Sequence, residues 1–168
     1  IQYDRNKTNF NQIVNLINSI SFDKLSVHES ENLIELPICY DEEFALDLQD
    51  IAIKSNLSIK EVINLHLSTE YYVYMIGFMP GLPFMGVLSN KIYTSRLTTP
   101  RLQVPSRSVA IVEKFCVIYP NASPGGWNIL GRTSQQLFFK EKTNPCILQP
   151  GTKVKFKRIT KNEFIKLE

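Results

Sequence analysis

Proline and glycine break the second half of the chain into short β-type runs, and this pattern constrains the fold most strongly. The runs are rich in Val, Ile, Phe and Tyr, and strands are expected at residues 71–76, 108–112, 115–119, 137–139 and 154–159. Turn residues between such runs are typical of an all-β domain. With 43% hydrophobic residues among 168, the chain can bury a core. The pattern therefore predicts a closed barrel or a sandwich.

Two loops within this region concentrate residues that bend a chain. Residues 77–86 hold three glycines and two prolines, so we expect neither a regular helix nor a central strand there. Residues 123–133 include Gly125 and Gly126, whose backbone amides can approach a ligand closely, and Arg132, which can clamp a carboxylate or phosphate. The Gly-Lys-Ser/Thr ending of a Walker loop is missing. Taken alone, each loop fits a structural turn as well as a binding site.

The first 70 residues are expected to form mainly helices. Ser58 and Glu61 have the spacing of a capping box, which indicates the start of a helix. The polar stretch 21–32 has no clear period and is interpreted as a linker or a loosely held hairpin. Helices are expected over residues 10–20, 44–55 and 58–69, and a strand over residues 33–40.

Charge and cysteine content argue against several classes of function. A net charge of +3 is too small to imply binding to nucleic acid or an anionic membrane. The basic run 153–158 alternates, and we interpret it as an edge strand with its lysines in water. Cys39, Cys116 and Cys146 lie far apart, which predicts a reducing cytosol and neither a disulfide framework nor a metal site. The sequence contains no run of about 18 apolar residues, so no transmembrane helix is expected.

Several short motifs occur in an order that resembles one protein family. They are Leu36-Pro-Ile-Cys-Tyr40, Leu65-His66, residues 71–86, Thr99-Pro-Arg101, Val104-Pro105, Ser108-Val109, Tyr119-Pro120, Ser123-Pro-Gly-Gly-Trp127 and Gly131-Arg-Thr133. From Leu36 onward the chain is thereby similar to the KipI-like family, also called allophanate hydrolase subunit 1 or the carboxyltransferase C/D-type domain. The resemblance implies a mainly β fold with helices. It also implies a cyclophilin-like closed β-barrel over residues 32–168, preceded by the tail of a small α/β domain over residues 1–31.

The resemblance also implies an activity, that of the B subunit of an ATP-dependent 5-oxoprolinase. In such a complex this chain works with subunits A and C, in the cytoplasm, to open 5-oxo-L-proline to L-glutamate. Activating a lactam by phosphorylation needs cations or backbone N–H groups to hold phosphate and oxyanion. Catalytic roles are expected for His66, Arg101 and Arg132, and substrate or phosphate binding for Ser108, Gly125, Gly126 and Trp127.

Two groups of candidate residues have competing interpretations. His66 is either a general acid or base, with Glu70 to orient it, or a hydrogen-bonded histidine packed on the apolar face of its helix. Phe78 and Phe84 are expected either in the core or at a subunit interface, and we predict that they are interface residues. Trp127 either anchors its loop by packing or lines the pocket.

Two further functions remain open from the sequence. The name-giving relative of the family inhibits a sensor histidine kinase, so a kinase-binding module is one alternative. A component of an allophanate- or urea-related carboxyltransferase-type hydrolase is the other, because fold alone does not decide function. Neither a metal nor a prosthetic group is expected from this chain, and ATP enters as a co-substrate of the complex.

Overall fold

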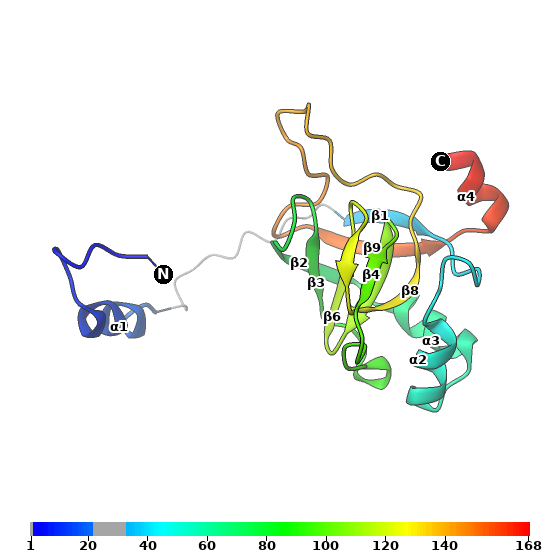
Figure 1. The fold of residues 1–168 in the computed structure, drawn as a ribbon, viewed down its shortest axis with the longest axis horizontal. Helices are drawn as coiled ribbons and strands as arrows, with labels where there is room; N and C mark the ends of the chain where they lie inside the picture. Colours follow the sequence, from blue (N-terminus) through cyan, green and yellow to red (C-terminus); the bar gives the residue numbers. More distant parts are fainter. Residues whose placement is uncertain (1, 22–32) are drawn as a thin grey trace.

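The computed structural model describes residues 2–21 and 33–168. A seven-stranded sheet forms the body of the protein, with its strands in the order β1-β9-β2-β3-β6-β5-β8 (Figure 1). The two ends of this order meet, because Cys39 after β1 and Arg132 in β8 exchange two backbone hydrogen bonds of 2.9 and 3.0 Å. The sheet is thus rolled into the barrel that the resemblance implies. The strands are β1 Leu33–Ile38, β2 Tyr71–Ile76, β3 Pro83–Gly86, β5 Ser108–Val112, β6 Phe115–Ile118, β8 Asn128–Arg132 and β9 Lys153–Arg158.

Both faces of the sheet are covered at β5, where all five residues are buried. Val109 and Ile111 belong to the main core, whereas Ala110 and Val112 belong to a second, smaller core. An antiparallel ribbon of β4 (Arg101–Val104) and β7 (Ser123–Gly125) contributes Val104 to this second core. Burial on two sides explains why the run 108–112 lacks the alternation of apolar and polar residues found in strands with one wet face.

Two helices pack against the barrel strands. Helix α2 (Leu48–Ser55) contacts β8, and helix α3 (Ile59–Ser68) contacts β9, so both lie at one end of the barrel (Figure 1). The capping box at Ser58 is confirmed, since its N–H donates to the Glu61 carboxylate at 2.8 Å and its hydroxyl accepts from the Glu61 N–H at 3.2 Å. The expected helix over 44–55 begins only at Leu48, because the Asp41 carbonyl accepts two N–H groups in a preceding turn.

Two shorter helices and one amphipathic helix complete the described chain. They are the 3-10 helix η2 (Asn90–Ile92), α4 (Lys161–Leu167) and α1 (Phe10–Asn18). Helix α1 confirms the expectation of a helix near residues 10–20, and it buries none of its residues. It stands to one side of the barrel in Figure 1.

The boundary expected at residue 31 and nearly all of the linker 21–32 lie outside the described residues, so the division into two domains stays a prediction. No helix within 2–21 or 33–168 is long and apolar enough to cross a bilayer.

The two turn-rich loops are more regular than expected. Residues 77–86 contain β3, which lies between β2 and β6 rather than at an edge, so the expectation of no central strand is wrong. Pro83 is the first residue of that strand, a position where the missing N–H of proline is tolerated. Residues 123–133 contain both β7 and β8. Gly86, Gly125 and Gly131 lie in these strands, and at each of them a neighbouring group comes within 3 Å of the place that a Cβ would take.

Two other strand expectations need correction. The basic run 153–158 is β9, and it lies between β1 and β2 instead of at an edge. Its alternation is nevertheless real, because Val154 and Phe156 are buried while Lys155 and Lys157 are exposed. Residues 137–139 form a single bridge, Phe138 to Cys146, and no named strand. Lysines at alternate positions show which face of a strand is wet, and they do not show whether the strand has one neighbour or two.

Replacing Gly131 by Ala is expected to lower the free energy of unfolding by about 3 kcal/mol through overpacking at the barrel seam. A Cβ atom at Gly131 would lie 2.6 Å from the Cys39 carbonyl oxygen, where the backbone of β1 meets β8. At Gly77 the nearest atom to such a Cβ is a Phe84 ring carbon at 3.6 Å, so Gly77→Ala is the matched control with less than about 1 kcal/mol of change. Urea unfolding of both variants measures the difference, and equal stabilities would contradict the closure of the barrel at this seam.

Candidate functional site

A cavity of about 290 Å³ lies beside the second core, where the segment after β2 meets the ribbon. Aromatic side chains, the Gly125-Gly126 turn and one arginine surround it. The lining residues are Phe78, Leu82, Phe84, Arg96, Pro100, Val117, Tyr119, Pro124, Gly125, Gly126 and Trp127. The cavity therefore brings together five of the residues that the sequence singled out, at Phe78, Phe84 and residues 125–127.

Two aromatic rings form the wall of this cavity. The ring of Trp127 is almost fully buried and meets Phe84 edge to face, with 5.8 Å between ring centroids. This arrangement suits the quadrupoles of both rings and fixes their orientation. Trp127 therefore packs against Phe84 and also lines the cavity, and its binding role stays a prediction.

Phe78 lies at the rim of the cavity in an unusual conformation. Its side chain is 71% exposed, and its φ of 68° is in the left-handed region that few residues with a Cβ adopt. A large apolar side chain held in water by a strained backbone points to a functional constraint, because packing against the residues that the structure describes does not account for it.

Arg96 and Tyr119 complete the cavity; the sequence interpretation missed Arg96 and gave Tyr119 a place in the motif Tyr119-Pro120 but no role at a site. The Arg96 guanidinium lies over the Trp127 ring, 5.8 Å from its centroid, and Arg96 is the one charged residue in the lining. The Tyr119 side chain is 3% exposed, and burial raises its pKa, so the hydroxyl keeps its proton at neutral pH. Arg96 stands in a segment without strand or helix, so periodicity gave no signal for it. Tyr119 was expected to end the strand 115–119, and it follows directly after β6.

Arg101 lies outside the lining and is held in an ion pair. Its Nη2 donates to Asp47 Oδ1 at 2.6 Å, and the Asp47 side chain is only 4% exposed. The other oxygen of Asp47 accepts the Ile129 N–H at 2.6 Å. Asp47 therefore fastens the ribbon to β8 through Arg101, a structural use of the charge that the sequence pattern does not distinguish from catalysis.

Arg132 and Ser108 also lie outside the lining, at the opposite end of β8 and β5 from Asn128. The Arg132 Nε donates to the Ser106 carbonyl at 2.8 Å, and its guanidinium lies over the Phe44 ring at 5.9 Å. Burial, and then the charge of Arg107, lower the pKa of Arg132. The Ser108 hydroxyl donates to the Pro105 carbonyl at 2.8 Å. The structure does not bring these two side chains to the cavity, and their predicted roles stay predictions.

His66 lies in the main core, away from the cavity. It is 0% exposed, and its Nδ1 shares a hydrogen bond of 2.6 Å with the Tyr40 hydroxyl. On the other side of the ring, Nε2 lies 3.7 Å from the Cys116 sulfur. Desolvation lowers the pKa of His66 to about 3, so the ring is neutral at physiological pH. This geometry fits the packed-histidine interpretation. The expected orienting residue, Glu70, instead pairs with Lys153 at 3.9 Å.

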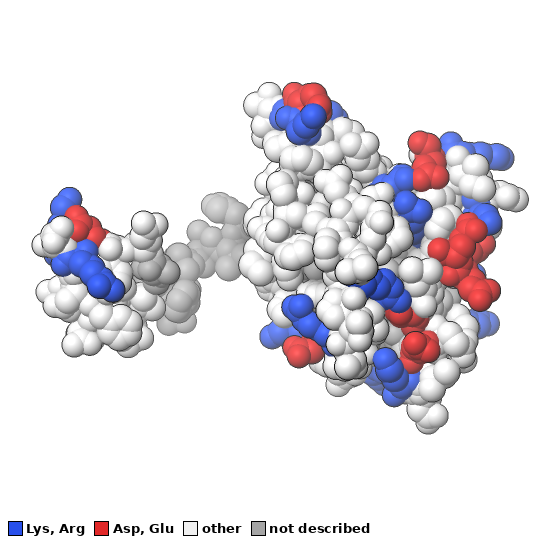
Figure 2. Space-filling view, viewed as in Figure 1, with Lys and Arg blue, Asp and Glu red and all other residues white. Residues whose placement is uncertain are grey.

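A second, more apolar cavity of about 380 Å³ lies on the other side of Phe84. Tyr74, Met75 and Val87 line it, and each is about half exposed. The part of the surface over β2 and β3 carries few charged side chains (Figure 2). Within residues 2–21 and 33–168, no group of three or more His, Cys, Asp or Glu side chains is placed to hold a metal ion.

Gly125→Ala is expected to lower the free energy of unfolding by about 1–3 kcal/mol, because the new Cβ would lie 2.6 Å from the Tyr119 hydroxyl and 3.0 Å from Val104. At Gly126 the nearest atoms to a Cβ belong to Pro100 at 3.5 Å, an ordinary contact, so Gly126→Ala is expected to change stability by less than about 0.5 kcal/mol. Thermal unfolding of the two neighbouring variants compares them directly. A tolerated Gly125→Ala would mean that Tyr119 does not lie under this turn.

Comparisons with known proteins agree with the fold and motifs. The family model described as carboxyltransferase domain, subdomain C and D, matches residues 1–148. The B subunit of the 5-oxoprolinase of Bacillus subtilis (strain 168) is 40% identical over 135 residues, which cover 80% of this chain and 56% of that protein. The corresponding protein of Escherichia coli O157:H7 is 40% identical over 131 residues, covering 78% and 60%. The chain thus spans somewhat more than half the length of these curated relatives.

Solved structures give the same result. A conserved uncharacterized protein from Pyrococcus horikoshii has a TM-score of 0.77 at 37% identity, covering 96% of this chain and 74% of that one. The urea carboxylase of Kluyveromyces lactis has a TM-score of 0.67 at 21% identity, covering 80% and 14%, which shows a shared fold alone. The resemblance found in the sequence is therefore confirmed, and the chain belongs to the family of the carboxyltransferase domain, subdomain C and D.

Proposed function

We propose that this chain acts within the B subunit of an ATP-dependent 5-oxoprolinase, in a cytoplasmic complex with subunits A and C. The observation that carries the proposal is its similarity to curated relatives from several bacteria, each named as the B subunit of a 5-oxoprolinase. Three free cysteines, two of them buried, are consistent with a reducing compartment. ATP is the co-substrate of the proposed complex.

The reaction explains why the chain would need partners. Opening a five-membered lactam requires an activated carbonyl, a site for phosphate and a shielded place for the ring. The cavity beside Trp127 offers apolar walls and one cation, Arg96. Both features support binding of the 5-oxo-L-proline ring there. Within the proposal, the groups that handle ATP come from the assembled complex, with the Gly125-Gly126 turn at the cavity edge as this chain's contribution.

Reconstitution tests the proposal. The full-length protein that contains this chain is mixed with subunits A and C from the same genome, and glutamate release from 5-oxo-L-proline is followed with and without ATP. A matched mixture without the B subunit is the control. ATP-dependent release that requires the B subunit is the expected result, and an assembled complex of folded subunits that never consumes 5-oxo-L-proline contradicts the proposal.

The remaining alternatives have less support. Kinase inhibition would use an exposed apolar surface, but the same surface serves equally well as a contact with another subunit. A urea-related hydrolase rests on the likeness to the Kluyveromyces lactis protein, and fold is not function.

Phe78→Gly is expected to weaken assembly with the partner subunits about tenfold or more while leaving the chain at least as stable. An exposed aromatic residue is a common interface anchor, and glycine adopts the φ of 68° without the cost of about 1–2 kcal/mol that a Cβ brings. Ile165→Gln on α4, where the side chain is 58% exposed, is the control for a surface apolar residue elsewhere. Sedimentation of the mixed subunits measures assembly, and unchanged assembly of the Phe78 variant contradicts the interface role.

A further inference from the structure

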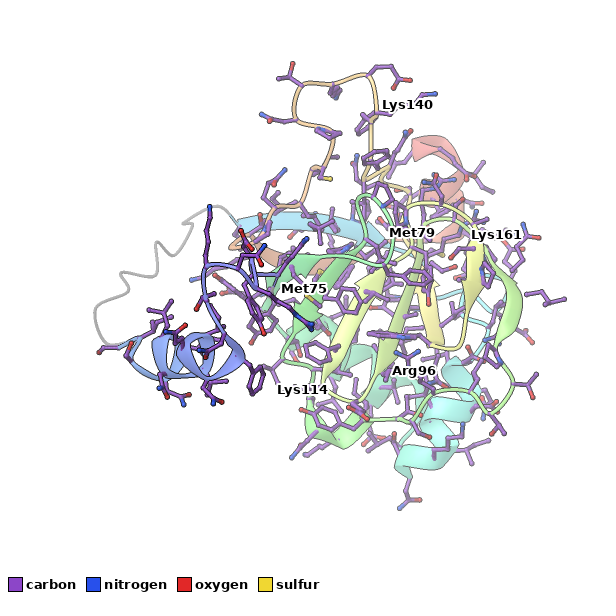
Figure 3. All side chains as sticks on the ribbon, turned by 60° about the vertical axis from the view of Figure 1, so that its left-hand side comes forward. Met75, Met79, Arg96, Lys114, Lys140 and Lys161 are labelled. Carbon is purple, nitrogen blue, oxygen red and sulfur yellow. The ribbon has the colours of Figure 1, made fainter. Side chains whose placement is uncertain are left out.

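The charge of the cavity beside Trp127 comes from one residue. Among the lining residues within 2–21 and 33–168, Arg96 is the single one that carries a charge, and none of them is a carboxylate that could neutralise it. In the described parts of the chain, Arg96 has no ion-pair partner, and its one contact of note is with the Trp127 ring. The other arginines near the barrel ends are engaged, Arg101 with Asp47 and Arg107 with Glu168. Figure 3 shows Lys140 and Lys161 well away from Arg96.

The cavity also holds an unpartnered polar atom. Tyr119 is 3% exposed and lines the cavity, and its hydroxyl forms no hydrogen bond with any residue that the structure describes. Among the described residues, the buried side-chain atoms without a partner are Arg101 Nη1 and Asn128 Oδ1. The Tyr119 hydroxyl is not one of them, so it faces open space where water or a bound molecule can reach it. The hydroxyl lies next to Gly125, where a Cβ atom would be 2.6 Å away, so the absence of a side chain at Gly125 leaves room over it.

Size and shape restrict what can fill this space. At about 290 Å³ the cavity is at the lower end of the range for small-molecule sites, roughly 300–1,000 Å³. The Trp127 and Phe84 rings offer flat apolar walls, which suit a planar or cyclic body. We propose that this cavity binds a small cyclic carboxylate, with Arg96 pairing to the carboxylate and the Tyr119 hydroxyl bonding to a second polar group on the ring.

This inference rests on the proposed function for its choice of ligand. 5-Oxo-L-proline has the required parts: one carboxylate, one nearly planar five-membered ring and a lactam group that can accept a hydrogen bond from a phenol. Arg96 thus takes the carboxylate-binding role that the sequence interpretation gave to Arg101 and Arg132. A guanidinium is suited to this role because it meets a carboxylate with two parallel hydrogen bonds.

Direct binding to the 168-residue chain tests the inference without any partner subunit. Ligand-observed NMR is recorded with 5-oxo-L-proline and with 2-pyrrolidinone, which has the same lactam ring and no carboxylate. Saturable binding of 5-oxo-L-proline, at least tenfold tighter than that of 2-pyrrolidinone, is the expected result. Absence of saturable binding, or equal binding of both compounds, overturns the inference.

Three variants locate the site. Arg96→Met is expected to weaken 5-oxo-L-proline binding about tenfold or more and to leave 2-pyrrolidinone unaffected, because a charge-assisted hydrogen bond is lost. Tyr119→Phe removes only the hydroxyl and is expected to weaken both compounds about fivefold, the size of one neutral hydrogen bond. Lys140→Met removes a distant positive charge and serves as the control, with unchanged binding. Unchanged affinity in Arg96→Met overturns the assignment.

The outcomes separate this inference from the proposed function. Binding that depends on Arg96, together with a reconstituted complex that releases no glutamate, supports the site and contradicts the 5-oxoprolinase role. An active complex in which Arg96→Met leaves both kcat and KM for 5-oxo-L-proline unchanged supports that role and overturns the site. A raised KM with a smaller change in kcat is the signature expected when both hold.

Discussion

Replacing Arg101 by Met is expected to lower the free energy of unfolding by about 3 kcal/mol. The variant leaves the Asp47 carboxylate without a countercharge in a place where only 4% of its side chain is exposed. Removing one partner of a buried pair costs roughly 3–5 kcal/mol, and the partial exposure of Arg101, at 27%, places this pair at the lower end. Urea unfolding followed by circular dichroism measures the loss.

Two comparisons make this result interpretable. Lys161 and Glu43 also pair at 2.8 Å, but both are about half exposed, so Lys161→Met is expected to cost less than about 1 kcal/mol. Adding Asp47→Asn to Arg101→Met removes the uncompensated charge, while the amide oxygen can still accept the Ile129 N–H. The double variant should therefore recover part of the stability. If Arg101→Met costs no more than Lys161→Met, the pair does not fasten the ribbon to β8.

The same variants bear on the catalytic role predicted for Arg101. If the side chain acts only by holding the ribbon, the double variant should recover activity in parallel with stability. If Arg101 also touches the reacting groups, activity stays lost in a protein whose stability has returned. Measuring both quantities on the same samples separates the two roles.

Acidification from pH 7 to pH 5 is expected to lower the free energy of unfolding by about 2 kcal/mol through His66 alone. Burial lowers the pKa of His66 from 6.5 to about 3. Between these two values the unfolded chain binds a proton that the folded chain excludes, so stability increases with pH. The contribution of neutral His66 to the free energy of unfolding is complete above pH 6.5, and it is lost progressively as the pH falls toward 3.

The sequence provides its own control for this measurement. It contains two histidines, His28 and His66. His28→Gln is expected to keep the slope of stability against pH that depends on His66, whereas His66→Gln should remove that slope and also lower stability at pH 7. Denaturation midpoints at half-unit intervals from pH 7 to pH 5 stay mostly above the range in which carboxylates titrate. A slope that survives in His66→Gln would contradict the assignment to this residue.

Local patterns predicted much of the fold. The capping box at Ser58 and Glu61 and the strands at 71–76 and 108–112 depend on neighbouring residues, and they appear in the structure as expected. The position of β9 depends instead on which strands lie beside it. Its alternating lysines are the same whether it has one neighbour or two, so its place between β1 and β2 was not predictable from the run itself.

The candidate site shows the same limit more sharply. Gly125, Gly126 and Trp127 are adjacent in the sequence, and a Pro-Gly-Gly-Trp run attracts notice without any structure. Arg96 and Tyr119 reach the cavity only because the barrel brings separate segments together. The arginines that the sequence favoured are engaged by Asp47 and by the Ser106 carbonyl, and contacts between residues so distant in the sequence leave no local pattern.

The parallel pairing of β1 with β9 has a consequence for how this protein is made. Leu33 in β1 pairs with Lys153 in β9, so the first barrel strand of the described chain can form this pairing only once the last one is present. On a ribosome, β1 has no such neighbour until β9 has emerged, and the segment between the two strands forms a long closing loop. Folds dominated by such distant pairings complete in milliseconds to seconds, slowly for their size. The barrel therefore cannot close before β9 has been made, and a chain that stops before Lys153 leaves β1 without its partner.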